Sequence, residues 1–303
     1  MKEEKAYVIT GPTSGIGYET ALELAKHGTV VLVGRNRNKL EEVKRTINER
    51  GQDAAMVVCD VSDIISVKHA AKEIASLGLP IAGLLNNAGI MPQKALKNAQ
   101  GWDLTFATNY LGAFALTEAL VPHLPDGANV VFIGSAIEDP ERKPAKVMGM
   151  KGGQYLSAES SAKGIWKPGG AKMAGIDAYA TSKQCVLAAA MVLARETPRL
   201  HFNVIEPGIT PGTGLGNNGN RFVHFLMGSM MQLMMLLPAF SRYKSTPKKS
   251  AKVISDVVTD TSGRTGVYFD QKGNPMQGSV LSRSKEFQER VVLETRALLE
   301  KYS

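Results

Sequence analysis

Short apolar runs alternate along the 303-residue chain with longer segments whose apolar residues recur at helical spacing. The runs predict strands at residues 6–9, 29–33, 54–58, 81–85, 128–133, 201–205 and 266–270. The periodic segments predict helices at residues 18–27, 36–50, 102–124, 177–197, 248–260 and 284–302. This alternation predicts an α/β fold with a doubly wound, about seven-stranded parallel sheet flanked by helices.

Two segments interrupt this alternation, although no shift in composition marks a linker. We therefore expect residues 1–303 to form a single domain. Residues 136–176 are polar and rich in glycine, which predicts an inserted lobe on the surface rather than a second domain. Residues 209–245 combine a loop with a Met- and Leu-rich run, and we interpret them as a substrate loop or lid.

The Met- and Leu-rich run at 222–240 is just long enough to span a bilayer. His224, Gly228 and Gln232 argue against a transmembrane helix, as does the position of the run inside the predicted fold. The alternative to a lid is a peripheral membrane contact through residues 222–252, because basic residues follow the run.

Composition and charge narrow the class of protein. Cys59 and Cys185 are too few for a disulfide framework and have no metal ligands at a useful spacing, so we expect a reducing compartment and no metal site. The net charge of +8 is spread along the chain without a recognisable nucleic-acid module, so no nucleic-acid partner is expected. Residues 1–5 lead straight into the first strand without a signal peptide, which predicts a cytoplasmic protein.

A glycine-rich turn joins the first predicted strand to the first helix. Gly11 can turn the chain with positive φ, Gly15 lets a diphosphate approach bare backbone, and Gly17 lets helix and strand pack closely. The helix N-terminus then faces an anion. The turn predicts a dinucleotide-binding site formed by Gly11, Thr13, Ser14, Gly15, Ile16 and Gly17.

The residues after the second and third strands indicate the cofactor. Arg35 and Asn36 stand where an acidic residue would suit NAD, whereas an arginine accommodates the 2′-phosphate of NADP. NADP(H) is therefore expected, although Arg35 could simply be an exposed residue at the start of a helix. Asp60 and Val61 follow the third strand at the edge where ligands of such sheets bind. Asp60 could instead cap the next helix, for which Asp63 is the better candidate.

Tyr179 and Lys183 lie at i and i+4 of a predicted helix, so their side chains share one face. A nearby ammonium stabilises a phenolate. Tyr179 could therefore give a proton to a carbonyl oxygen as hydride reaches the carbon, or remove one in the reverse direction. Ser135, at the end of the fifth strand, could hydrogen-bond the same oxygen.

Taken together and in this order, the motifs resemble the short-chain dehydrogenase/reductase family, over nearly the whole chain. The closest pattern is that of the NADP-dependent carbonyl reductases and the retinol-dehydrogenase-like members. The resemblance implies a Rossmann-like fold. It is carried by the turn spaced T-G-x-x-x-G-x-G, Asn86-Asn-Ala-Gly89, Thr108-Asn-Tyr-Leu-Gly112, Ser135, Tyr179-x-x-x-Lys183 and Pro207-Gly208.

The resemblance also implies individual roles. Asp60 would hold the adenine ring, Lys183 would bind the nicotinamide ribose, and Asn109 would anchor a water in a proton relay. Tyr179 would be the general acid and base, and Ser135 would orient the substrate oxygen. The further cofactor contacts implied are Asn87, Ala88, Gly89, Pro207, Gly208 and Ile209.

Two features depart from the family pattern. Tyr179 follows Ser135 by 44 residues (179 − 135), whereas the family usually places these two residues much closer together. The residues between them make up the 136–176 insertion. Thr210 and Thr213 are both out of the register in which the family's threonine grips the nicotinamide carboxamide, so that contact stays open.

The expected function is an NADP(H)-dependent oxidoreductase that interconverts a carbonyl and an alcohol on a small apolar substrate. A double-bond reductase of the same family, in the manner of protochlorophyllide reductases, is one alternative. A non-catalytic dinucleotide sensor or scaffold is another. We expect the 136–176 insertion to lie near the helix of Tyr179 and to hinder the dimer and tetramer contacts common in the family, which favours a monomer.

Overall fold

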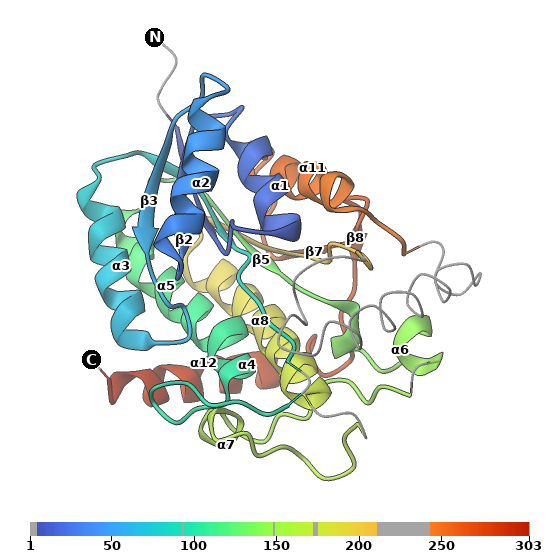
Figure 1. Ribbon diagram of the computed structural model, residues 1–303. Helices are drawn as coiled ribbons and strands as arrows, with labels where there is room; N and C mark the ends of the chain where they lie inside the picture. Colours follow the sequence, from blue (N-terminus) through green and yellow to red (C-terminus); the bar gives the residue numbers. More distant parts are fainter. Residues whose placement is uncertain (1–4, 93, 148, 172–174, 211–242, 303) are drawn as a thin grey trace.

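The structure is a computed structural model that describes residues 5–92, 94–147, 149–171, 175–210 and 243–302. Within these residues, eight strands form one sheet in the order β3-β2-β1-β4-β5-β6-β7-β8 (Figure 1). Neighbouring strands are parallel except for β7 and β8. The strands are β1 (Ala6–Thr10), β2 (Thr29–Gly34), β3 (Ala54–Val58), β4 (Ile81–Asn86), β5 (Asn129–Ile133), β6 (His201–Ile205), β7 (Val267–Phe269) and β8 (Pro275–Met276).

Helices cover both faces of this sheet, which confirms the predicted doubly wound α/β fold. One face packs against α1 (Gly15–Leu24), α2 (Arg37–Asn48) and α11 (Pro247–Val258). The other face packs against α3 (Ile64–Ser76), α5 (Gly112–Leu120) and α8 (Ile176–Glu196), and α12 (Lys285–Glu300) packs on the outside of α8 (Figure 1).

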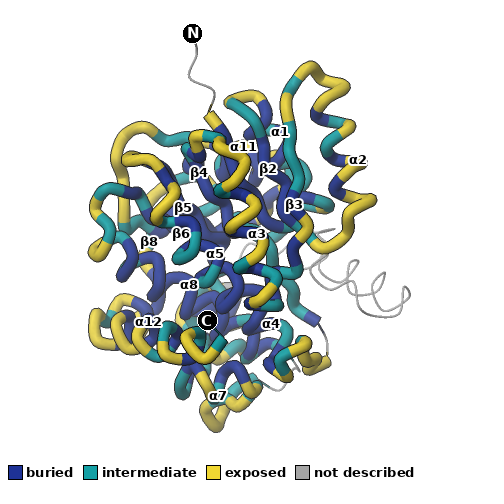
Figure 2. The backbone as a smooth tube through the Cα atoms, turned by 90° about the vertical axis from the view of Figure 1, so that its left-hand side faces the viewer, coloured by how far each residue is buried: buried dark blue, intermediate teal, exposed yellow. Residues whose placement is uncertain are grey.

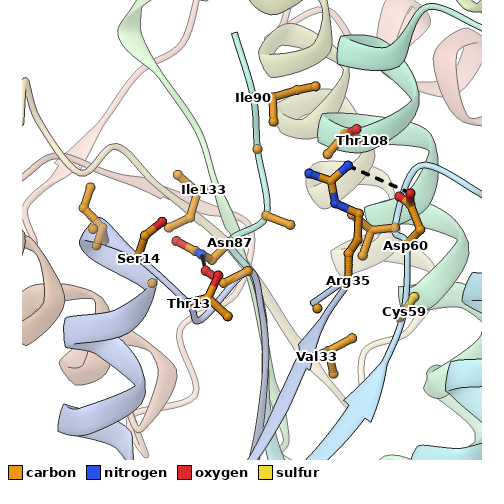
Figure 3. A pocket seen from close by; sticks show the side chains of 18 of the residues that line it. Thr13, Ser14, Val33, Arg35, Cys59, Asp60, Asn87, Ile90, Thr108 and Ile133 are labelled. Carbon is orange, nitrogen blue, oxygen red and sulfur yellow. Dashed lines mark hydrogen bonds and ion pairs between the residues drawn. The ribbon is translucent and has the colours of Figure 1, made fainter. Parts of the chain in front are cut away.

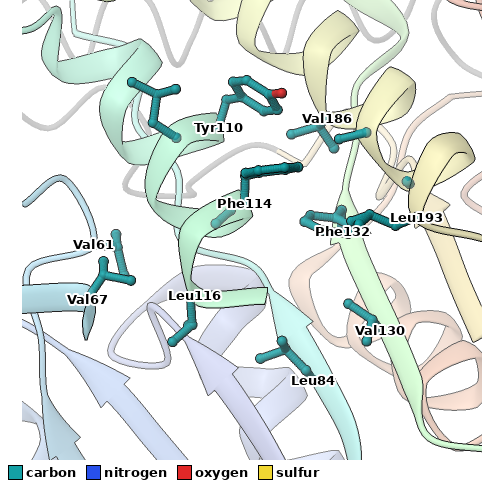
Figure 4. Packing of buried hydrophobic residues seen from close by; sticks show 14 of the residues in the cluster. Val61, Val67, Leu84, Tyr110, Phe114, Leu116, Val130, Phe132, Val186 and Leu193 are labelled. Atoms are coloured by element: carbon teal, nitrogen blue, oxygen red, sulfur yellow. The ribbon is translucent and has the colours of Figure 1, made fainter. Parts of the chain in front are cut away.

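The strands bury both of their faces, as the continuous apolar runs predict. In β1, Tyr7 and Ile9 belong to the core under α1 and α11, whereas Val8 belongs to the core under α5 and α8. Side chains alternate across a strand, so one run of apolar residues serves both cores. Figure 4 shows the larger core, where Phe114 of α5 and Val186 of α8 lie over Phe132 of β5.

The long helix predicted at 102–124 is not continuous. The chain instead forms α4 (Leu104–Phe106), the π-helical turn η1 (Ala107–Leu111), α5 and the 3₁₀ turn η2 (Val121–His123). A π-helical turn inserts one extra residue, and apolar spacing alone cannot reveal it. The first helix also begins earlier than predicted, at Gly15 rather than residue 18, because the last three residues of the glycine-rich turn already belong to α1.

The 136–176 insertion contains the turn η3 (Ala136–Glu138) and the short helices α6 (Lys143–Val147) and α7 (Ala158–Ala162). It is more deeply packed than its polar composition suggests, since Tyr155, Ala158 and Ala162 join the larger core. The backbone N–H of Gln154 donates to Thr181 Oγ1 at 2.8 Å, so the insertion lies against α8, the helix that carries Tyr179.

Most of the predicted lid, including the run at 222–240, lies outside the described residues, as does Thr213. The predicted membrane contact at 222–252 therefore falls only partly within them. None of the helices that the structure describes has both the length and the apolar character that a bilayer crossing needs.

Candidate active site

A cavity of ≈ 400 Å³ lies where β1, β2, β4 and β5 end (Figure 3). Every residue from Gly11 to Pro207 that the sequence predicts to bind a cofactor lines it, and so do Tyr179 and Lys183. The glycine-rich turn and the Tyr–Lys pair, about 160 residues apart in sequence, therefore face one space.

The glycine-rich turn adopts the backbone that the sequence predicts. Gly11 and Gly15 have φ of 67° and 56°, which L-residues with side chains rarely adopt. A Cβ on Gly17 would lie 2.2 Å from Gly11 O and 2.5 Å from Asn87 Nδ2. The turn therefore leaves bare backbone at the start of α1, and such a cradle fits the diphosphate of a dinucleotide.

Asn87 fixes this turn to the central strands. Its Nδ2 donates to Thr10 O at 2.8 Å and to Gly11 O at 3.1 Å. The backbone N–H groups of Asn87 and Ala88 both donate to Thr10 Oγ1, at 3.0 and 2.9 Å. Asn87 thus ties the end of β4 to the end of β1.

The end of β2 supplies positive charge to the cavity. The Arg35 side chain is 63% exposed, and its Nη1 lies 4.0 Å from Asp60 Oδ2 (Figure 3). Asn36 caps α2 by accepting a hydrogen bond from Lys39 N at 3.0 Å. Asp60 Oδ1 accepts from Ser62 N and Ser62 Oγ, whereas Asp63 caps α3, as the sequence favours.

Tyr179 and Lys183 occupy one face of α8, with Lys183 Nζ 5.6 Å from the centre of the Tyr179 ring. Burial raises the pKa of Tyr179 to about 12, and a hydrogen bond with Ser135 opposes this rise. Burial also lowers the pKa of Lys183 to about 8, while its Nζ donates to Ile133 O at 2.7 Å. At neutral pH Tyr179 is therefore a protonated phenol that can donate a proton.

Asn109 lies in the π-helical turn η1 and is buried. Its Oδ1 accepts from Ile90 N at 2.8 Å, and its Nδ2 donates to Ile90 O at 3.0 Å and to Ser182 Oγ at 3.2 Å. Asn109 thus joins the segment after Asn86-Asn-Ala-Gly89 to α8. The water-anchoring role that the resemblance implies stays a prediction.

Four of the predicted site residues do not line the cavity. Ser135 and Asn109 contact this region without being among the described residues that line the cavity, and Gly208 and Ile209 also lie outside its lining. Sequence reasoning missed several lining residues whose only signal is their position beside a recognised one. These are Val33, Gly34, Lys39, Cys59, Ile90, Thr108 and Ile133.

Among the residues that the structure describes, no group of three or more His, Cys, Asp or Glu side chains could hold a metal ion.

Comparisons with known proteins identify related sequences. The sequence profile described as short chain dehydrogenase matches residues 5–145. A short-chain dehydrogenase/reductase of Armillaria gallica is 31% identical over 215 residues, which cover 69% of this chain and 65% of that protein. Retinol dehydrogenase 13 of Mus musculus is 25% identical over 281 residues, covering 88% of this chain and 75% of that protein.

Solved structures share the fold. A short chain dehydrogenase from Burkholderia cenocepacia in complex with NADP has a TM-score of 0.65 at 21% identity, covering 90% of this chain and 99% of that one. A blue fluorescent protein from a metagenomic library, in complex with NADPH, has a TM-score of 0.65 at 20% identity, covering 89% and 96%.

The fold and the cavity define an α/β protein with a dinucleotide cradle. The chain belongs to the short-chain dehydrogenase/reductase family. It spans just under two thirds of the length of the Armillaria gallica relative.

Proposed function

We propose that this protein is an NADP(H)-dependent oxidoreductase that interconverts a carbonyl group and an alcohol on a small apolar substrate. The observation that carries the proposal is the convergence of Tyr179 and Lys183 with the glycine-rich turn on one cavity. The NADP and NADPH bound by the structural relatives support the choice of cofactor.

The side chains have distinct roles in this proposal. When bound, the reduced cofactor supplies a hydride to the carbonyl carbon. Tyr179 Oη donates its proton to the carbonyl oxygen, and Ser135, which hydrogen-bonds Tyr179, orients that oxygen. Lys183 binds the cofactor ribose beside the phenol and adds positive charge to the site. The oxidation of an alcohol runs through the same groups in reverse.

We also propose an apolar substrate and a cytoplasmic location, as the sequence predicts. A panel of candidate substrates tests the reaction, with NADPH oxidation followed by absorbance. The panel should contain quinones, aldehydes, steroids and aryl ketones. An activated alkene belongs in the same panel. If only the alkene is turned over, the protein is a double-bond reductase rather than a carbonyl reductase. If no compound is turned over, the result favours a binding protein.

The Tyr179→Phe variant tests the mechanism with any substrate found. We expect kcat/KM to fall at least about 100-fold, the usual contribution of a general acid, while NADPH affinity stays close to normal. The matched control is Tyr110→Phe, because the Tyr110 hydroxyl bonds Thr295 Oγ1 at 2.9 Å, away from the cavity. Near-normal turnover by Tyr179→Phe would contradict the proposed mechanism.

A further inference from the structure

A proline forms the part of the cavity wall that follows β6. Pro207 lines the cavity two residues after Ile205, which ends β6 and pairs with Ile133 of β5. The Ile133 carbonyl also accepts the hydrogen bond from Lys183 Nζ. In the sheet, β4 and β5 separate β6 from β1, which leads into the glycine-rich turn. Pro207 therefore lies beside the part of the cavity that holds Lys183, away from that turn.

Ser250 of α11 holds the Pro207 carbonyl. A proline has no backbone N–H, so its carbonyl is the only backbone group through which a hydrogen bond can fix Pro207. Ser250 is 1% exposed, and its Oγ donates to Pro207 O at 2.7 Å. Because a carbonyl oxygen can only accept, the single proton of the Ser250 hydroxyl serves Pro207.

A second serine fixes the position of the Ser250 hydroxyl. Ser245 is 6% exposed, and its Oγ lies 2.8 Å from Ser250 Oγ. The backbone holds Ser245 in turn, because Ile209 N donates to Tyr243 O at 2.8 Å and Ser245 N donates to Ile209 O at 3.0 Å. The two serines and the chain after Pro207 therefore form one buried, hydrogen-bonded cluster behind the cavity wall.

We propose that Ser250 is a positioning residue for the cofactor: its hydroxyl holds Pro207 where the nicotinamide half of NADP(H) meets the cavity wall. The glycine-rich turn and Arg35 line the cavity beside β1 and β2 and serve the adenosine half. Loss of the Ser250 hydroxyl therefore weakens binding of the whole cofactor and spares its adenosine part. The inference deepens the proposed function and rests on it for the effect on turnover, whereas the effect on binding needs the cofactor alone.

The test compares two buried serines of α11. Ser250→Ala removes the donor to Pro207. Ser255→Ala is the matched control, because Ser255 is 3% exposed and its Oγ has no hydrogen-bond partner among the residues that the structure describes. Each variant loses one buried hydroxyl from the same helix, and only the first loses a contact with the cavity wall. Ser250→Cys, which keeps the shape but has a weak donor, replaces Ser250→Ala if that variant fails to fold.

The readout is the dissociation constant of NADPH beside that of adenosine 2′,5′-bisphosphate, which carries the 2′-phosphate and lacks the nicotinamide. Both constants are measured by calorimetry without a substrate. We expect Ser250→Ala to weaken NADPH binding about fivefold or more, the effect of one lost hydrogen bond, and to change binding of the bisphosphate less than about twofold. Ser255→Ala should change neither constant.

Two results would overturn the proposal. One is an unchanged affinity for NADPH in the Ser250 variant. The other is an equal loss of affinity for both ligands, because a merely structural role of Ser250 would affect the whole cavity. If no candidate substrate is turned over, the proposed function fails, whereas the two dissociation constants still decide the role of Ser250.

Discussion

Arg35 and Lys39 bring two cations to the cavity beside the end of β2. A guanidinium and an ammonium can both bind the 2′-phosphate of NADPH with charge-assisted hydrogen bonds. If each such contact contributes about 1.5 to 3 kcal/mol, each gives a preference over NADH of about tenfold or more. The ion pair of Arg35 with Asp60 is exposed and costs little to break.

We therefore expect Arg35→Asp to reverse or abolish the NADPH preference and Lys39→Gln to reduce it about tenfold. The dissociation constants of NADPH and NADH, measured by fluorescence, give the ratio directly. Lys44→Gln is the control for Lys39→Gln, because Lys44 lies on α2 outside the cavity. Equal affinities for both cofactors in the unmodified protein would reduce Arg35 to an exposed residue at a helix start.

Lys183 makes the stability of the fold depend on pH. Its pKa falls from 10.5 to about 8 on burial, so between these values the unfolded chain binds a proton that the folded chain does not. Its contribution to the free energy of unfolding therefore rises with pH across this window, by about 3 kcal/mol.

Urea unfolding at about pH 7.5 and about pH 10 measures this effect. The quantity compared is the free energy of unfolding of the unmodified protein minus that of Lys183→Met. The unmodified protein should gain stability relative to Lys183→Met at the higher pH. Lys163→Met is the control, since the Lys163 side chain is 59% exposed. A difference that stays constant with pH would contradict the lowered pKa of Lys183.

At the residue scale, site residues can be predicted from the sequence when they follow a strand or form a motif with a characteristic spacing. Gly17, Asn87 and Tyr179 belong to this class, because their roles follow from backbone geometry and from i, i+4 spacing. Lys39 could not be found in this way. It lines the cavity because the first turn of α2 lies beside the end of β2, and no periodicity records that placement.

At the scale of elements, every predicted strand is present, since long apolar runs between turns permit few other structures. The additional strand β8 has two residues, too few to give a pattern. The division of residues 104–123 into α4, η1, α5 and η2 also escaped prediction. Only a glycine fits at position 112, where α5 begins, because a Cβ there would clash with Val61 O.

One carboxylate of α12 accepts two hydrogen bonds from the insertion. Glu294 Oε2 accepts from Tyr155 Oη at 2.7 Å and from Ala158 N at 3.0 Å, and Tyr155 is 1% exposed. Glu294→Ala leaves both donors without this acceptor. We expect it to lower the free energy of unfolding by about 1 to 3 kcal/mol and the melting temperature by a few degrees.

Hydrogen exchange locates this loss, which should concentrate in residues 155–162. Glu289→Ala is the matched control on the same helix, because the Glu289 side chain is 56% exposed and its nearest cation, on Arg195, is 3.9 Å away. That control should change stability by less than about 1 kcal/mol. Equal effects of the two variants would show that Glu294 does not fasten the insertion.

At the scale of the whole molecule, α8 is the element on which sheet, insertion and C-terminal helix meet. Fifteen of its 21 residues are buried within the described part of a single chain. The burial comes from the sheet on one side and from α12 and the insertion on the other (Figure 2). Arg296 of α12 adds ion pairs to Glu118 of α5 and Glu196 of α8, at 2.9 and 2.6 Å.

This packing argues for a monomer. The apolar face of α8 that points away from the sheet is covered by the chain's own α12 and insertion. A partner docking there would have to displace Tyr155 and Phe287, which pack against each other with ring centres 5.6 Å apart. Light scattering at micromolar concentration should therefore give a mass near 32.6 kDa.

A substitution on the outer surface of α12 distinguishes a monomer from an oligomer that packs through this helix. Leu293 of α12 is 72% exposed, so it is a residue through which a second copy could pack on the covered face. In a monomer, Leu293→Asp should leave the measured mass unchanged, because no partner loses a contact. A stable tetramer of about 130 kDa (4 × 32.6), dissociated by Leu293→Asp, would show instead that α12 builds an interface rather than blocking one.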